Sequence, residues 1–158
     1  MAGLVTELNG KEKRMRNRSE VIELICEYGN SKDYIKKIHS EMDLLKADIE
    51  AMRQLSAVNY DGMPKGSTTS DPTAKAATYI VDVYESRIET LKGNVARIME
   101  RKALAEELLD RLTDDERKVI EERYIKGTRW DFIPGILHFE RTWCFELRKR
   151  ALKKMCKC

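Results

Sequence analysis

Basic, hydroxyl and aromatic side chains gather near the end of the chain, in a combination suited to DNA. The candidates are Arg129, Arg141, Thr142, Phe145, Glu146, Arg148, Lys149, Arg150, Lys153 and Lys154. Arginine can hydrogen-bond base edges in the major groove, and an aromatic ring or a threonine methyl can meet the thymine methyl group. Lysine and arginine also bind phosphates, which confer affinity and register without reading sequence. We expect positions 141, 142, 145 and 146 to face bases and the later basic residues to face phosphates.

A helix from about Arg141 to Met155 would present six of these side chains on one face: Arg141, Thr142, Phe145, Glu146, Lys149 and, further along, Lys153. Apolar residues recur at helical spacing on the other face: Cys144, Leu147, Ala151, Leu152 and Met155. Trp143 is expected to pack in the small core, against Phe139 or Trp130, because aromatic side chains dominate small cores. A basic amphipathic helix is often only a solvated surface, so the segment before it decides whether it reads DNA.

That segment carries start and stop signals for another helix. Thr113 and Glu116 have the spacing of a capping box, in which each side chain satisfies a free backbone N–H. Gly127 can end this helix. Its predicted buried face consists of Val119, Ile120, Tyr124 and Ile125. A short helical segment at about 132–137 then leads to the basic helix, which gives the order of a helix-turn-helix.

Residues 112–155 resemble the helix-turn-helix of bacterial sigma factor region four, which reads the upstream promoter hexamer. The matching residues are Leu112, Thr113, Glu116, Arg117, Val119, Ile120, Arg123, Tyr124, Gly127, Trp130, Ile133, Leu137, Leu147, Arg150, Ala151, Leu152, Lys153 and Lys154. The whole chain resembles phage-encoded transcription regulators of the ArpU and RinA kind, which activate late or packaging genes. This resemblance implies a sequence-specific regulator that binds double-stranded DNA, with bacterial RNA polymerase as a further candidate partner.

Three residues depart from that family pattern: Pro134, His138 and Glu140 stand where alanine, glycine and serine are usual. If Thr128 caps the supporting helix, Pro134 lies in its interior and costs about 3 kcal/mol or more. If Asp131 is the cap, Pro134 falls in the first turn, where its missing N–H is harmless. We therefore predict a supporting helix that starts late or bends at Ile133–Pro134.

Two apolar seams precede the helix-turn-helix. Their members, spaced alternately by three and four residues, are Ile35, Ile38, Met42, Leu45, Ile49 and Met52, then Val81, Tyr84, Ile88, Leu91, Val95 and Ile98. This a/d spacing is typical of coiled coils, and two matching seams joined by one loop predict an antiparallel helical hairpin. Because such an arm seldom buries both faces alone, we expect a homo-oligomer, a dimer or larger.

The predicted domains are a helical arm over residues 1–112 and a helix-turn-helix domain over residues 113–158. Within the arm we expect helices at about 11–29, 31–57 and 72–112, and a loop at about 58–71. Gly29-Asn30 is a plausible helix stop and Ser31 a cap for the next helix. Pro72 suits a first helical position, with Ser70 or Asp71 as the cap.

Composition agrees with an all-α fold of this size. The chain has 158 residues, of which 36% are charged, 7% are aromatic and only three are proline, a balance closer to long helices than to a turn-rich β fold. The 30 basic and 27 acidic residues nearly balance. Four scattered cysteines and the lack of an apolar leader predict a cytoplasmic protein with no membrane span. The resemblance to phage regulators implies that this cytoplasm is that of a bacterial host cell.

Catalysis and metal binding are not expected. No nucleophile–base set, phosphate-binding glycine loop or paired-carboxylate cleft can be recognised, so we predict no enzyme activity and no cofactor. Cys156 and Cys158 could form half of a zinc site, but Cys26, Cys144, His39 and His138 have no spacing that completes four ligands.

Two alternatives to a transcription regulator remain open. The DNA-recognition (small) subunit of a phage packaging terminase combines similar parts in a ring, so an oligomer above a dimer would favour it. A helical interaction module whose helix-turn-helix no longer binds DNA is the other, because Pro134 and Glu140 lie within the DNA-facing unit.

Overall fold

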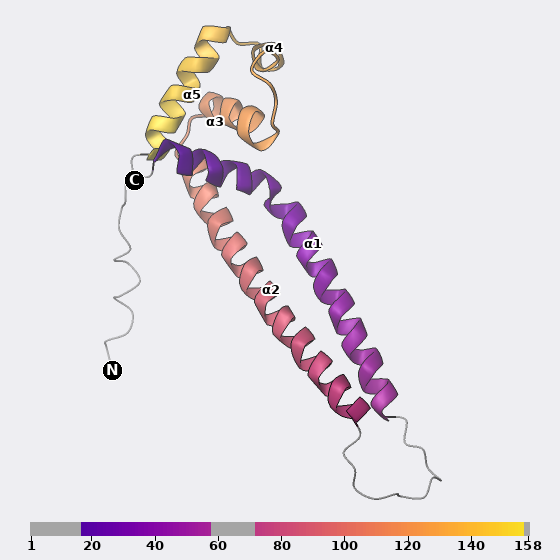
Figure 1. Ribbon diagram of the computed structural model, residues 1–158. Coiled ribbons are helices and arrows are strands. Elements are labelled where there is room, and N and C mark those ends of the chain that lie inside the picture. The colour runs from indigo at the N-terminus through magenta and orange to yellow at the C-terminus, as the bar shows by residue number, and fades with distance from the viewer. Residues whose placement is uncertain (1–16, 58–71, 157–158) are drawn as a thin grey trace, which may run out of the picture. The chain divides into compact units, whose positions relative to one another are not determined.

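The computed structural model describes residues 17–57 and 72–156, and all its regular elements over these ranges are helices, joined by short turns (Figure 1). The elements are α1 (Arg18–Ala57), α2 (Pro72–Asp110), α3 (Asp114–Ile120), the π-helical turn η1 (Glu121–Ile125), α4 (Ile133–Leu137) and α5 (Arg141–Cys156). The predicted all-α fold, with a long helical hairpin and a C-terminal helix-turn-helix, is confirmed. None of these helices has the apolar length required to cross a bilayer.

Two structural units divide the described residues. The first, here called the head, contains residues 17–30 and 101–156, and the second, called the arm, contains residues 31–57 and 72–100. These units divide near residues 30 and 100 rather than at the boundary predicted between residues 112 and 113. The ends of α1 and α2 belong to the head because their apolar faces complete its core.

The helix α1 runs without a break from Arg18 to Ala57, so the predicted stop at Gly29-Asn30 and the predicted cap at Ser31 are wrong. Asn30 Nδ2 donates to the Cys26 carbonyl at 3.0 Å, a bond within the helix, and Ser31 is buried. Gly29 has a packing role: a Cβ there would lie 3.0 Å from the Ile125 carbonyl oxygen. The proposed helix start near residue 11 lies outside the described residues.

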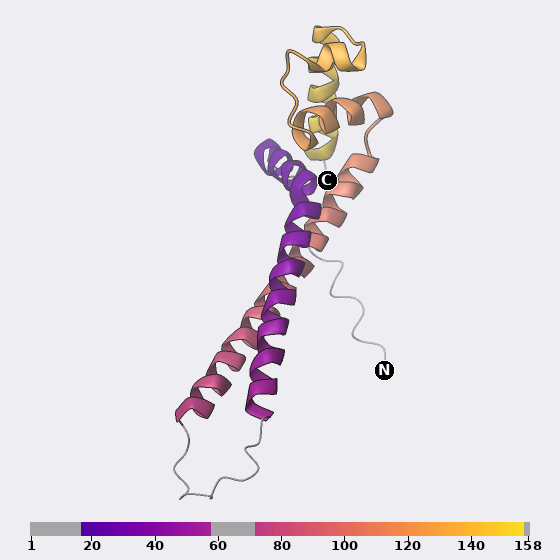
Figure 2. The same ribbon diagram turned by 90° about the vertical axis from the view of Figure 1, so that its right-hand side faces the viewer.

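In the arm, α1 and α2 pack side by side and antiparallel, as Figures 1 and 2 show. The two predicted seams meet: Met42, Ile49, Ile88 and Leu91 are buried, with Ile38, Leu45, Val81 and Tyr84 packed around them. Ion pairs flank this seam, with Arg53–Glu85 at 2.7 Å and Arg87–Glu41 at 2.8 Å. Residues late in α1 therefore meet residues early in α2.

The α2 helix has the predicted extent to within two residues. It includes Pro72 and ends at Asp110 rather than at Leu112. The caps considered for its start, Ser70 and Asp71, and the loop at 58–71 lie outside the described residues. Within the helix, apolar side chains of the last ten residues turn into the head core.

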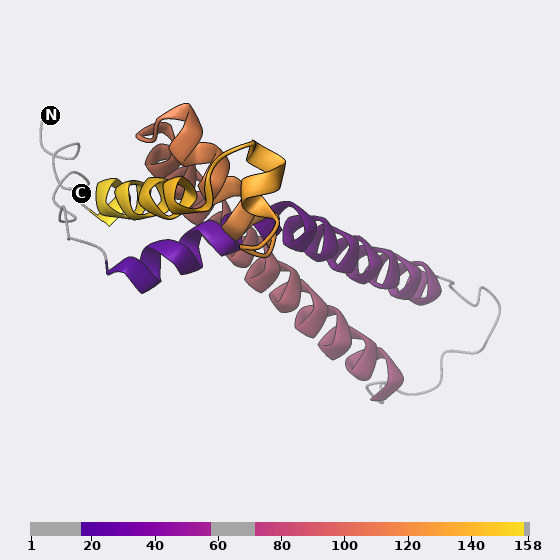
Figure 3. The ribbon, with the colours of Figure 1, turned by 90° about the horizontal axis from the view of Figure 1, so that it is seen from above.

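The head core draws on α1, α2, α3 and α5. Its fully enclosed members are Val21, Leu24, Ile25, Ala105, Leu108, Leu109, Ile120, Ala151, Leu152 and Met155. Figures 1 and 3 show the start of α1 close to the C-terminal end of α5. A helix-turn-helix of three short helices has little core of its own, and the ends of the two long helices supply the missing apolar surface.

The start of α3 is the predicted capping box, in which the Glu116 carboxylate accepts the Thr113 backbone N–H at 3.0 Å. The helix then widens into η1, where the Lys126 N–H donates to the Glu121 carbonyl at 2.9 Å, five residues back. Sequence periodicity did not indicate this π-helical turn. Gly127, with φ of 72°, ends the segment in the left-handed conformation that favours glycine.

Candidate nucleic-acid interface

The helix α5 has one buried and one exposed face. The predicted apolar face is confirmed: Cys144, Leu147, Ala151, Leu152 and Met155 are all buried. The opposite face exposes Thr142, Glu146, Lys149 and Lys153. Packing against α3 and the core thus fixes which side chains α5 can offer to a partner.

The short helix α4 starts late, as predicted from Pro134. Its N-cap is Phe132, not Thr128 or Asp131, and its five residues begin at Ile133. Pro134 is the second of these, where no intrahelical partner exists for an N–H, so the ring costs little. Ile133 is fully buried and anchors the helix.

The turn between α4 and α5 passes through His138, which has φ 55° and ψ 39°. This left-handed backbone explains why a glycine suits the position, since a residue with a Cβ is strained there. The turn closes through the Phe139 N–H, which donates to the Pro134 carbonyl at 3.0 Å. Glu140 stands at the cap position, because its carbonyl accepts the Cys144 N–H at 3.0 Å.

Trp130 is the centre of an aromatic and cationic cluster beneath the start of α5. Its ring stacks on Phe145, with 4.9 Å between centroids. The guanidinium groups of Arg123 and Arg148 lie 5.7 and 5.5 Å from its centroid. Arg148 Nε also donates to the Tyr124 hydroxyl at 2.7 Å. Arg148 is therefore engaged inside the head, and one face of Phe145 is covered.

Asp131 lies between two of the candidate arginines. One of its carboxylate oxygens is 3.5 Å from Arg141 Nη2, and the other is 3.8 Å from Arg129 Nη2. All three side chains are more than half exposed, at 66% for Arg141, 78% for Arg129 and 57% for Asp131. The first turn of α5 thus carries a cationic pair with a shared counter-ion.

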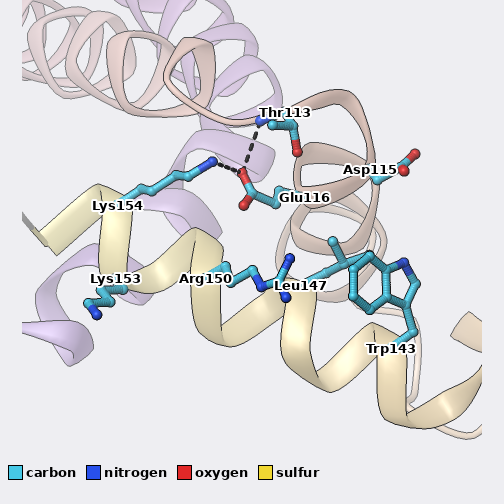
Figure 4. Close-up of a pocket in the computed structure, with 8 residues that line it drawn as sticks. All are labelled: Thr113, Asp115, Glu116, Trp143, Leu147, Arg150, Lys153 and Lys154. Atoms are coloured by element: carbon cyan, nitrogen blue, oxygen red, sulfur yellow. Dashed lines mark hydrogen bonds and ion pairs between the residues drawn. The ribbon is translucent and has the colours of Figure 1, made fainter.

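A shallow groove lies between α3 and α5 (Figure 4). Trp143 lines it and is 39% exposed, so the prediction that this ring packs in the core is wrong. Its partner is Arg150, whose guanidinium carbon lies 4.9 Å from the ring centroid. Trp130, rather than Trp143, stacks on Phe145, and Trp143 lies on the side of α5 that borders α3.

Glu116 and Lys154 form an ion pair at 2.7 Å in this groove, with the Glu116 side chain only 4% exposed. Burial, the largest influence, raises the pKa of the Glu116 carboxyl. The hydrogen bonds from Lys154 and from the Thr113 backbone, with the charge of Lys154, together hold that pKa below its ordinary value of 4.5. Lys154 is therefore held in an ion pair with Glu116 within the head.

Glu122 fixes the loop that leads to Arg129. It is buried, it pairs with Lys126, and it accepts the Thr128 hydroxyl at 3.1 Å. The hydrogen bond from Lys126 is the main reason that the pKa of Glu122 lies below its ordinary value; burial opposes this and the Thr128 hydroxyl adds to it. The loop before α4 is thus tied to η1 by charge as well as by its backbone.

The ten candidates divide into three groups. Five exposed basic residues remain available around α5: Arg129, Arg141, Lys149, Arg150 and Lys153. Thr142, Phe145 and Glu146 are also exposed. Arg148 and Lys154, expected to contact phosphates, have partners within the head.

Sequence reasoning missed the residues that hold the surface in place. Trp130 was matched to the family only as an apolar residue, and nothing in its spacing indicated the Phe145 stack. Asp131 was considered only as a cap, because its approach to Arg141, ten positions on, depends on the turn through His138.

Cysteine and metal chemistry find no support in the described residues. No three His, Cys, Asp or Glu side chains there are grouped closely enough for a metal ion. Burial raises the pKa of the Cys144 thiol, which keeps it protonated and inert.

Comparisons of this chain with protein-family models, with curated proteins and with solved structures found no match.

Proposed function

We propose that this chain is a sequence-specific, double-stranded DNA-binding transcription regulator of the phage or prophage type, acting on late or packaging genes and self-associating through its arm. The observation that supports the proposal is the contrast between the two faces of α5. All five apolar residues of one face are buried, while the other face presents exposed hydroxyl, carboxylate and basic groups directly after the turn that joins α4 to α5.

An α-helix fits the major groove, and the first two turns of a recognition helix approach the bases. Arg141, Thr142 and Glu146 lie in those turns and are exposed. Phe145 offers one ring edge beside them, and Arg129, Lys149, Arg150 and Lys153 surround this set with positive charge. Bases are therefore assigned to the start of α5 and phosphates to its rim.

The arm is the proposed self-association surface. Its seam uses only one side of each helix, and large apolar residues remain exposed elsewhere, including Leu44 at 69%, Tyr79 at 70% and Val83 at 45%. Apolar groups of this size favour contact with a second arm. Two heads on one assembly would bind DNA more tightly than either alone.

Selection from a random duplex library, followed by footprinting and salt titration of the recovered site, tests DNA binding. Arg141→Ala should lower discrimination between matched and mismatched sites by about 1–3 kcal/mol. Lys153→Ala should weaken all sequences alike and reduce the salt slope by about one. Lys46→Ala, a basic residue of the arm, is the control and should change neither. Absence of duplex binding at low salt would refute the proposal.

The mass of the protein in solution tests self-association. A dimer supports the regulator, and a ring larger than a dimer would favour the terminase small subunit instead. Replacing Leu44 and Val83 together by Gln should reduce the oligomer to monomers without unfolding the hairpin, because both side chains are exposed in the single chain. An unchanged mass would place self-association elsewhere.

A further inference from the structure

We infer that Asp131 is a specificity-determining residue: its carboxylate holds Arg141 for base contact and competes with DNA phosphates for both Arg141 and Arg129. This inference rests on the proposed function. It assigns a role to an acidic side chain at the centre of a basic surface, where repulsion from DNA would otherwise make it a disadvantage.

The geometry of the three side chains supports this role. Each carboxylate oxygen takes one arginine, at 3.5 Å for Arg141 and 3.8 Å for Arg129. Asp131 precedes α4 and Arg141 is the first residue of α5, so the pair spans the helix-turn-helix turn. The backbone of that turn is held by the His138 conformation and the Phe139–Pro134 hydrogen bond.

Because the side chains are exposed, the ion pairs of Asp131 with Arg141 and Arg129 can break and form again. Ion pairs between exposed side chains are worth about 0.2–1 kcal/mol, so a phosphate can displace the carboxylate. On non-specific DNA both arginines would bind phosphates, and their ion pairs with Asp131 would be lost. At a matched site Arg141 would contact a base while still paired with Asp131, so the pair would be kept. The carboxylate therefore penalises non-specific complexes more than specific ones.

The other basic residues of the surface differ in this respect. Arg150 lies over the Trp143 ring, a neutral partner that does not compete for phosphate through charge. Among the five basic residues that remain available around α5, Arg129 and Arg141 are the two for which the structure records a carboxylate partner. Neutralising Asp131 should thus affect a defined pair rather than the whole surface.

The test compares binding of the wild type and Asp131→Asn to the selected site and to a random duplex of equal length. Asp131→Asn should bind the random duplex about three- to tenfold more tightly at low salt, with a steeper salt dependence. Its affinity for the selected site should stay the same or fall. Asp131→Glu keeps the charge and should restore most of the discrimination.

Asp110→Asn is the matched charge control. It removes one exposed negative charge from the same head, and its partner is Arg117, at 3.1 Å, which is not on the proposed DNA surface. Equal gains from Asp110→Asn and Asp131→Asn would overturn the inference, because net charge alone would then explain them. Placing Asp131→Asn in an Arg129→Ala, Arg141→Ala background should abolish the gain, and a gain that persists there would also overturn it.

The outcomes separate the two proposals. If no variant binds any duplex, the proposed function fails and the inference fails with it. If the wild type binds its site but Asp131→Asn leaves the ratio of specific to random affinity unchanged, the inference alone fails. A lower ratio that depends on the two arginines supports both.

Discussion

The head and the arm bury their apolar residues to different degrees. In the head, Ala105, Leu108 and Leu109 are completely inaccessible, because helix segments from four parts of the chain surround them. In the arm, Met42 and Ile88 keep 6% and 7% exposure, since only two helices cover the seam. The same residue types therefore stabilise the head more than the arm, and the arm can relax where the head cannot.

The largest expected effect comes from matched leucine truncations. Leu108→Ala should destabilise the head by about 3–4 kcal/mol, because it leaves an enclosed cavity. Leu91→Ala should destabilise the arm by about 2 kcal/mol, since two helices can close on the gap. Site-resolved amide hydrogen exchange measures the two units separately. Equal losses would contradict the proposed difference between them.

The ion pairs give a second contrast. Lys154→Ala leaves a buried Glu116 carboxylate without its cation and should cost the head about 1–3 kcal/mol. Arg87→Ala breaks the pair with Glu41, whose side chains are 52% and 44% exposed, and should cost the arm less than about 1 kcal/mol. Urea denaturation, followed by amide hydrogen exchange in each unit, compares the two losses of stability. A larger loss for Arg87→Ala than for Lys154→Ala would contradict the expected contrast between the two ion pairs.

The same glutamate makes the head sensitive to acid. Because the pKa of Glu116 is lowered on folding, its stabilisation is complete above the ordinary value of 4.5 and disappears as the pH falls through the lower folded value. Head amides should lose protection over that acid range, and Glu116→Gln should flatten the dependence. An identical acid profile for this variant would show that other groups control it.

Replacing one glycine in each unit by alanine should change the stability of the two units in opposite directions. Gly93→Ala adds a methyl group into open space and should stabilise the arm helix by about 0.5–1 kcal/mol. Gly29→Ala places the same group 3.0 Å from the Ile125 carbonyl oxygen, and should destabilise the head by about 1 kcal/mol despite its helix propensity. Thermal unfolding of both variants measures the signs.

The last test concerns backbone strain in the turn before α5. His138→Gly should stabilise the head by about 1 kcal/mol relative to His138→Ala, because glycine adopts the left-handed backbone without strain. Gly127, at φ 72°, offers the reverse control, since Gly127→Ala should cost a similar amount. No difference between the two His138 variants would mean that the turn changes conformation freely.

Local signals predicted much of the fold from sequence. The seams, the Thr113–Glu116 box, the apolar face of α5 and the late start of α4 each depend on residues within a few turns of one another. Proline geometry alone located the beginning of α4 to within a residue or two. These features were recognisable because their physical causes are local.

The rest depended on contacts between distant segments. Gly29 resembled a helix stop, but it allows the close approach of η1, which no periodicity reveals. Arg148 and Lys154 were assigned to phosphates because their partners, Tyr124 and Glu116, lie on another helix. Similarly, Trp143 lies in the groove beside α3, with Arg150 over its ring, and Trp130 stacks on Phe145 instead.

The shared core of the head has a practical consequence for dissecting the molecule. A fragment consisting of residues 113–158 would lack Val21, Ile25 and Leu108, and it would expose the apolar sides of Ile120 and Leu152 to water. Such a fragment should aggregate when expressed alone. Grafting this helix-turn-helix onto another carrier would likewise require transplanting the start of α1 and the end of α2, so it cannot be exchanged as a C-terminal cassette.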